Sequence, residues 1–265
     1  MATGVAAVEV TRARRVGFYV VVVAALALVV FGLGELLFLG VVGWAGESAL
    51  EVTEPGAGVH LFHVLAHALF AWLLLIFLAA QLRHPERQFA AAVLALAAMI
   101  AYSLGTLVSG VFDPLEGAAI VLLAAVLWLS PGREHARVTP VRRGTLLAWI
   151  PMLAGGVMVV VAEVGRQVSG GTTDQHAEFG HYGLMAAIAV IVVLAALIGS
   201  TSLAGRRLVA WLTVGSLVYL AVASMLFSNQ ASSLGAAGGA VALAMGLLYG
   251  WDALSERQSV TQAGR

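Results

Sequence analysis

Apolar segments separated by short polar turns recur along the whole chain. The apolar segments span about 16–43, 60–82, 88–111, 115–130, 145–168, 178–199, 208–227 and 233–250. Most are close to the roughly 20 residues that an α-helix needs to cross the hydrocarbon core of a bilayer. Helix-stopping prolines such as Pro85, Pro114 and Pro131 lie in the breaks. The pattern predicts an all-α, polytopic membrane protein with eight transmembrane helices.

Composition supports this fold class. Of the 265 residues, 61% are apolar and 11% are charged, whereas soluble domains have roughly 45–50% and 25%. The formal net charge is zero, which gives no reason to expect nucleic acid as a partner. The apolar composition makes the lipid bilayer the expected partner. The chain contains no Cys, which excludes disulfides, thiolate metal ligands and Cys nucleophiles.

The arginines predict how the chain is oriented. Every basic residue except Arg166 lies in the segments 1–15, 83–87, 131–143, 200–207 and 251–265, which alternate with the predicted outer loops. Because cytoplasmic loops are enriched in Arg and Lys, we expect both termini in the cytoplasm and the chain in the cell (inner) membrane. The first apolar segment is too long for a signal peptide, so it is interpreted as a retained helix.

The chain also divides into two similar halves, residues 1–138 and 139–265. Each half has four predicted helices, a Glu in the outer part of its first helix (Glu35 and Glu163) and His at the start of its second. Because four is an even number, both halves would share one orientation about an axis along the membrane normal. We therefore predict an internal duplication.

Three histidines line the start of the second apolar segment. His60, His63 and His67 are spaced i, i+3 and i+7, which places them within about 60° of one another on a helix. Glu35, on the neighbouring first helix, is expected at the depth of His67. Ionisable groups in a bilayer are costly unless they meet a partner or a cavity. We therefore expect Glu35, His63 and His67 to converge, with His60 above them.

The second half offers further candidates at the same depth. His181 begins its second helix, and Glu163 lies near the outer end of its first. We expect these two residues to contribute across the repeat interface or to form a degenerate copy of the site. Glu163 and Arg166 are spaced i, i+3, so a buried ion pair is an alternative interpretation. His176 is interpreted as an interfacial residue in contact with water.

These residues favour an outward-facing site for a transition metal or a metal cofactor. Imidazole and carboxylate ligands suit Cu(II), Zn(II) or Fe(II). One alternative is haem or quinone redox chemistry, with two histidines from neighbouring helices as axial ligands of haem. Another is a proton-coupled transporter of small solutes, because Glu and His form proton relays in membranes. No nucleophilic triad or phosphate-binding loop is visible, so the sequence leaves open whether the protein is an enzyme.

Overall fold

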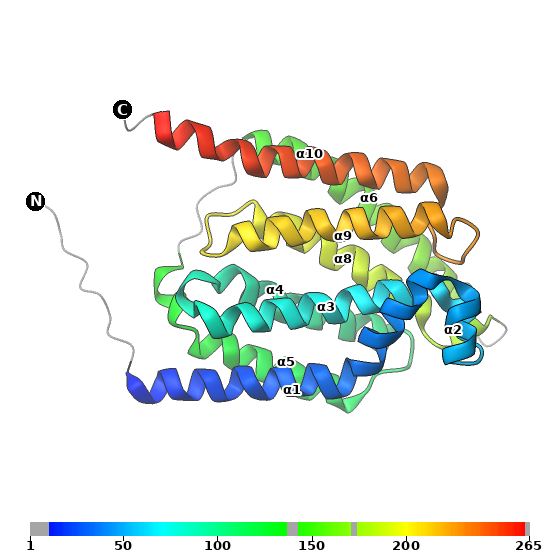
Figure 1. Cartoon of the computed structure of the whole chain (residues 1–265), viewed down its shortest axis with the longest axis horizontal. Helices are drawn as coiled ribbons and strands as arrows, with labels where there is room; N and C mark the ends of the chain where they lie inside the picture. Colours follow the sequence, from blue (N-terminus) through cyan, green and yellow to red (C-terminus); the bar gives the residue numbers. More distant parts are fainter. Residues whose placement is uncertain (1–10, 137–142, 171–173, 263–265) are drawn as a thin grey trace, which may run out of the picture.

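The computed structural model describes residues 11–136, 143–170 and 174–262, and regular structure in these ranges is entirely helical. The long helices are α1 (Arg12–Val42), α3 (Leu61–Arg83), α4 (Phe89–Val108), α5 (Pro114–Leu129), α6 (Arg143–Gly170), α8 (His181–Gly199), α9 (Arg206–Leu226) and α10 (Gly235–Gln262). Short elements join them: η1 (Gly43–Ala45), α2 (Glu47–Thr53), η2 (Gly58–His60), η3 (Pro85–Arg87), η4 (Pro131–His135) and α7 (Gln175–Glu178). The long helices run side by side in one bundle (Figure 1).

Within the described residues, six helical segments are long and apolar enough to cross a membrane. They are Arg12–Ala45, Gly58–Arg83, Phe89–Val108, Trp149–Gly170, His181–Gly199 and Arg206–Leu226. The predicted fourth span corresponds to α5, which has only 16 residues, and the predicted eighth span corresponds to α10. The all-helical, multi-pass character is therefore confirmed, while the number of eight spans stays a prediction.

The burial of the helices agrees with a lipid environment. The spans formed by α3 and α8 are the most buried, and those formed by α1 and α6 the least. The outer helices expose large apolar side chains, such as Phe31 (88% exposed) and Val161 (67%). An apolar surface of this extent is unfavourable in water and favourable against lipid.

Both halves of the chain use the same pattern of helix neighbours. In the first half, α1 packs on α3 and α5, and α4 packs on the same two helices. In the second half, α6 packs on α8 and α10, and α9 packs on the same two helices. The largest contact between the halves joins α4 to α8. In Figure 1 this arrangement places α1 and α5 at one edge of the bundle and α6 and α10 at the opposite edge.

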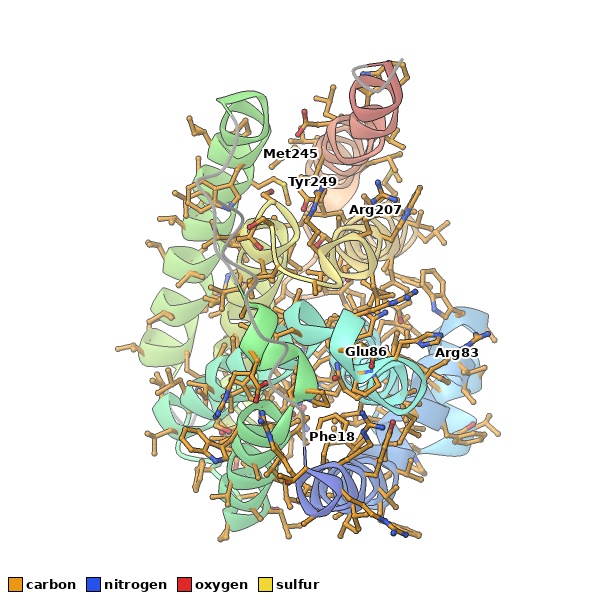
Figure 2. All side chains as sticks on the ribbon, turned by 90° about the vertical axis from the view of Figure 1, so that its left-hand side faces the viewer. Phe18, Arg83, Glu86, Arg207, Met245 and Tyr249 are labelled. Carbon is orange, nitrogen blue, oxygen red and sulfur yellow. The ribbon has the colours of Figure 1, made fainter. Side chains whose placement is uncertain are left out.

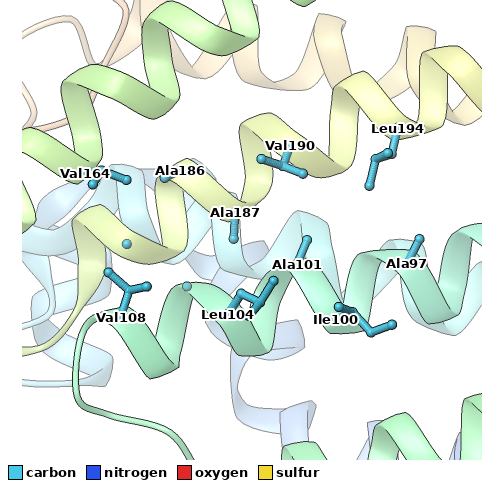
Figure 3. Close-up of a pocket in the computed structure, with 12 residues that line it drawn as sticks. Ala97, Ile100, Ala101, Leu104, Val108, Val164, Ala186, Ala187, Val190 and Leu194 are labelled. Carbon is cyan, nitrogen blue, oxygen red and sulfur yellow. The ribbon is translucent and has the colours of Figure 1, made fainter.

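Small residues allow α4 and α8 to approach closely. A Cβ atom at Gly105 would lie 2.6 Å from the carbonyl oxygen of Gly183, so no larger residue fits there without a shift of the backbone. Beside this contact runs an apolar groove of about 400 Å³ between the two helices (Figure 3). Leu104 and Val108, which line it, are 55% and 59% exposed. The groove therefore belongs to the outer apolar surface of the bundle.

The two ends of the bundle differ in chemistry. α3 runs from the histidine stripe to Arg83, so these features lie at opposite ends, which we call the histidine end and the arginine end. Figure 2 looks onto the arginine end and shows Arg83, Glu86 and Arg207 there. The described part of α1 begins at this end, and that of α10 ends there (Figure 1). Residues 137–142 of the predicted basic linker lie outside the described residues.

The connection between α1 and α3 consists of η1, α2 and η2. Glu51 in α2 accepts hydrogen bonds from the backbone N–H groups of Gly56 (2.9 Å) and Gly58 (3.1 Å). These two bonds stabilise the carboxylate and lower its pKa. Because η2 continues directly into α3, they also hold the backbone that carries His60.

Candidate metal centre

Five histidines meet at the histidine end. They are His60 in η2, His63 and His67 in α3, His176 in α7 and His181 at the start of α8. The ring centroid of His181 lies 4.5 Å from that of His60, 4.8 Å from that of His63 and 5.8 Å from that of His67. The centroid of His176 lies 4.6 Å from that of His60. α3 and α8 are in contact and begin at the same end, which brings their first residues together. We call these five residues the histidine cluster.

Three members of the histidine cluster have the geometry of a ligand set. One ligand atom from each of His60, His63 and His181 lies within 4.8 Å of the other two. Each of the three side chains also has a buried Nδ1 atom that has no hydrogen-bond partner among the described residues. A buried polar atom without a partner costs about 1–3 kcal/mol. Three such atoms in neighbouring side chains form a donor set that a bound metal ion would satisfy.

The hydrogen bonds of His63 identify which of its nitrogens is free. The hydroxyl of Ser232 donates its proton to Glu163 Oε2 (2.8 Å). The oxygen atom of this hydroxyl, Ser232 Oγ, lies 3.0 Å from His63 Nε2. Since the only proton of this hydroxyl is used, Nε2 of His63 carries the proton and donates it to Ser232. The lone pair of the neutral ring is then on Nδ1, the atom without a partner. Arg166 pairs with Glu163 at 2.8 Å.

His67 lies deeper in the bundle than the three ligand candidates. Its side chain is buried, and within the part of the chain that the structure describes its Nε2 atom has no hydrogen-bond partner. Its ring lies edge-on to Tyr102, with centroids 6.3 Å apart. His67 thus belongs to the histidine cluster, as the sequence predicts, but stands behind the three convergent side chains.

His176 is held within the histidine cluster by its neighbours and is half-buried, so its side chain still reaches the surface, where the sequence analysis expects it. Its Nε2 lies 3.3 Å from the backbone oxygen of Val59, and its Nδ1 lies 3.4 Å from Asp174 Oδ1. Asp174 caps α7 by accepting from the backbone N–H of His176 (2.9 Å) and also accepts from the hydroxyl of Tyr182 (2.8 Å). Burial acts to raise the pKa of Asp174, but these hydrogen bonds outweigh it and lower the pKa.

The two glutamates predicted at the site have different positions. Glu163 is buried and reaches the histidine cluster through Ser232, while forming the predicted ion pair with Arg166. Glu35 is exposed on α1 and is not part of the group of convergent ligand atoms. The inward face of α1 holds Val22, Ala25 and Val29, and Leu33 also packs against the core. Glu35 follows Leu33 by two positions, about 200° around the helix, so its side chain points away from that face.

The remaining histidines lie apart from the histidine cluster. The side chain of His84 is 52% exposed at the arginine end and lies 4.0 Å from Glu86. The side chain of His135 lies outside the described residues.

The sequence analysis did not identify Ser232 as a site residue. Its φ angle is +61°, and it is the one non-glycine residue with a positive φ in the described ranges. This conformation is strained for a residue with a Cβ atom, and such strain is found preferentially at functional sites. A serine in a polar turn carries no sequence signal of this kind, because the positive φ is visible only in the folded chain.

No protein-family model, curated protein or solved structure matches the chain. The chemistry of the site must therefore be argued from its own residues.

Proposed function

We propose that this chain is an integral membrane protein that binds a transition-metal ion through His60, His63 and His181. The observation that carries the proposal is the convergence of their three ligand atoms, together with a buried, unpaired Nδ1 on each ring. The hydrogen bond from His63 to Ser232 supports it further, because metal-binding histidines usually donate their second N–H to an orienting acceptor. In this arrangement Glu163 does not bind the metal ion itself but orients His63 through Ser232.

Three neutral imidazoles suit Zn(II), Cu(II) or Fe(II). A zinc ion bound by three histidines keeps its fourth position for water or a substrate, which is the pattern of catalytic rather than structural sites. His67 and His176 adjoin the three ligands and would control the space around that position. Zn–N bonds of about 2.0–2.1 Å require the ligand atoms to lie closer together than 4.8 Å, which small rotations of the side chains would achieve.

We further propose eight spans, with the metal centre on the outer side of the cell membrane and both termini in the cytoplasm. The arginine-rich turns support this orientation, since they lie at the end opposite the histidine cluster. In this arrangement α5 and α10 cross the membrane together with the six longer apolar helices. The shared neighbour pattern of α1, α3, α4 and α5 and of α6, α8, α9 and α10 supports an internal duplication.

The packing of the rings favours a metal ion over haem. The rings of His63 and His181 stack with an interplanar angle of 23° and centroids 4.8 Å apart. Axial ligands of haem stand on opposite faces of a wide, flat macrocycle, whereas these imidazoles pack directly against each other.

Elemental analysis of the purified protein tests the proposal. After dialysis against zinc, copper or iron and removal of loosely bound ions, we expect about one ion per chain for one of these metals. His63→Ala and His181→Ala should lose that ion while retaining helical circular dichroism, and His84→Ala should keep it. A Soret band would instead indicate haem. If no metal binds and no haem is present, the relay of Glu163, Ser232 and His63 would point to proton-coupled transport.

A further inference from the structure

A cavity of about 350 Å³ lies within the second half of the chain. Residues of α6, α8, α9 and α10 form its walls, and Phe62 of α3 contributes at one side. Every lining residue except Ser232 is apolar or glycine. The volume falls within the roughly 300–1,000 Å³ of typical ligand sites. A ligand that fills this cavity must therefore be largely apolar, with at most one polar region.

The polar region of the cavity adjoins the histidine cluster. Ser232 lines the cavity and bonds to both Glu163 and His63. Val159, which also lines the cavity, lies one helical turn before Glu163 on α6. A polar group placed at Ser232 would thus be next to the side chains that hold His63.

The cavity reaches the lipid-facing surface between α6 and α10. Met158 of α6 and Val241 of α10 both line it and are 73% and 59% exposed. Met245, another lining residue, lies between the same two helices in Figure 2. An apolar molecule can therefore enter sideways from the bilayer without crossing water.

The methionines of the chain are concentrated in this cavity. Met152, Met158, Met185 and Met245 line it, which is four of the seven in the chain. The flexible thioether side chain adapts to ligands of variable shape. Such a lining suits a flexible hydrocarbon chain better than a rigid ring system.

We propose that this cavity binds the hydrocarbon chain of a single-chain membrane amphiphile whose polar group can donate a hydrogen bond, such as a long-chain alcohol, with its hydroxyl at Ser232 Oγ, which has already donated its own proton to Glu163. A fully polar ligand is excluded because the apolar walls would leave its polar atoms without partners. This inference names the class of molecule that would bind next to the proposed metal centre. It rests on the proposed function only for the placement of the polar group beside a bound metal ion. Binding of the hydrocarbon chain is tested without added metal, so the two proposals can fail separately.

Photo-crosslinking in nanodiscs tests the inference. The probe is a long-chain alcohol with a diazirine near its methyl end, and mass spectrometry locates the label. We expect label on Met152 and Met245, and competition by unlabelled hexadecan-1-ol but not by hexadecane, which has no polar group.

A cavity-filling variant provides the decisive comparison. A Cβ atom at Gly155 would meet only Met245 Cε, at 3.8 Å, so Gly155→Leu fills the cavity without a backbone clash. We expect it to reduce labelling about tenfold, because the hydrocarbon chain loses its apolar contacts. Gly165→Leu on the same helix is the control, since a Cβ atom there meets nothing within 4 Å, and it should label like the parent protein.

The outcomes separate the two proposals. If Gly155→Leu keeps both its label and its metal, the amphiphile site is wrong and the metal site stands. If Gly155→Leu loses the label while His63→Ala still binds metal, the metal site is wrong and the amphiphile site stands. Equal loss of label in Gly155→Leu and Gly165→Leu, or label spread over the outer surface without competition, would also overturn the inference.

Discussion

At the scale of single residues, the hydrogen bonds behind His63 determine how the site is organised. The spacing of His60, His63 and His67 is visible in the sequence, because a helix places such residues on one face. The sequence cannot give the rotation of α1 about its axis, so it placed Glu35 at a site that the structure builds without it. Ser232 joins the site through a turn between distant helices, which no local pattern predicts.

Replacing Ser232 tests whether it positions His63. Ser232→Ala removes the acceptor for His63 Nε2–H, so the ring loses the bond that fixes its tautomer. Loss of such an outer partner typically weakens metal affinity about 10- to 100-fold, which competition with a chelator measures. Ser232→Gly, which adopts the positive φ freely but also lacks the hydroxyl, should weaken the affinity to a similar extent. The control is Ser169→Ala, which removes an exposed hydroxyl that donates to the backbone oxygen of Arg166 in its own helix and should change nothing.

The pH dependence of metal binding follows from the ligand type. A protonated imidazole has no lone pair for a metal, so protons compete with the ion. Bound metal should therefore be retained at neutral pH and released as the pH falls through and below about 6.5, the ordinary pKa of His. Equilibrium dialysis at several pH values measures this release. Full occupancy far below that range would indicate carboxylate ligands instead.

At the scale of helices, most boundaries could be predicted from the lengths of the apolar segments and from the prolines between them. α3 was predicted at about 60–82 and spans Leu61–Arg83, and α9 was predicted at about 208–227 and spans Arg206–Leu226. The short helices α2 and α7 were not predicted, since four to seven residues carry too little periodicity. The close contact of α4 with α8 also depends on tertiary packing, although the glycines that permit it are visible.

Gly105→Ala tests that contact between α4 and α8. The added Cβ atom would lie 2.6 Å from the Gly183 carbonyl oxygen, so the helices must separate. We expect a loss of about 1–3 kcal/mol in the free energy of unfolding, measured by denaturation in detergent. Gly215→Ala on α9 is the matched control, because a Cβ atom there meets nothing within 4 Å. It should be neutral or slightly stabilising, and equal destabilisation by both variants would contradict the packing argument.

At the scale of the whole molecule, the proposed orientation in the membrane depends on the location of the histidine cluster and the arginine-rich turns at opposite ends of the bundle. The sequence predicts this opposition through its alternating arginine-rich turns. The absence of Cys allows it to be tested directly by single-cysteine labelling in intact cells. Val52→Cys in α2 should react with a membrane-impermeant thiol reagent, and Glu86→Cys should react only after permeabilisation. The reverse pattern would place the metal centre on the cytoplasmic side.

X-ray absorption spectroscopy of the metal-loaded protein tests the central claim most directly. The account predicts three imidazole nitrogens at about 2.0–2.1 Å from a zinc ion, with one oxygen ligand such as water completing a tetrahedron. In His63→Ala, any ion that remains should show one imidazole fewer. A spectrum of the parent protein with only oxygen ligands, or one that is unchanged in His63→Ala, would contradict the assignment of His60, His63 and His181 as the metal centre.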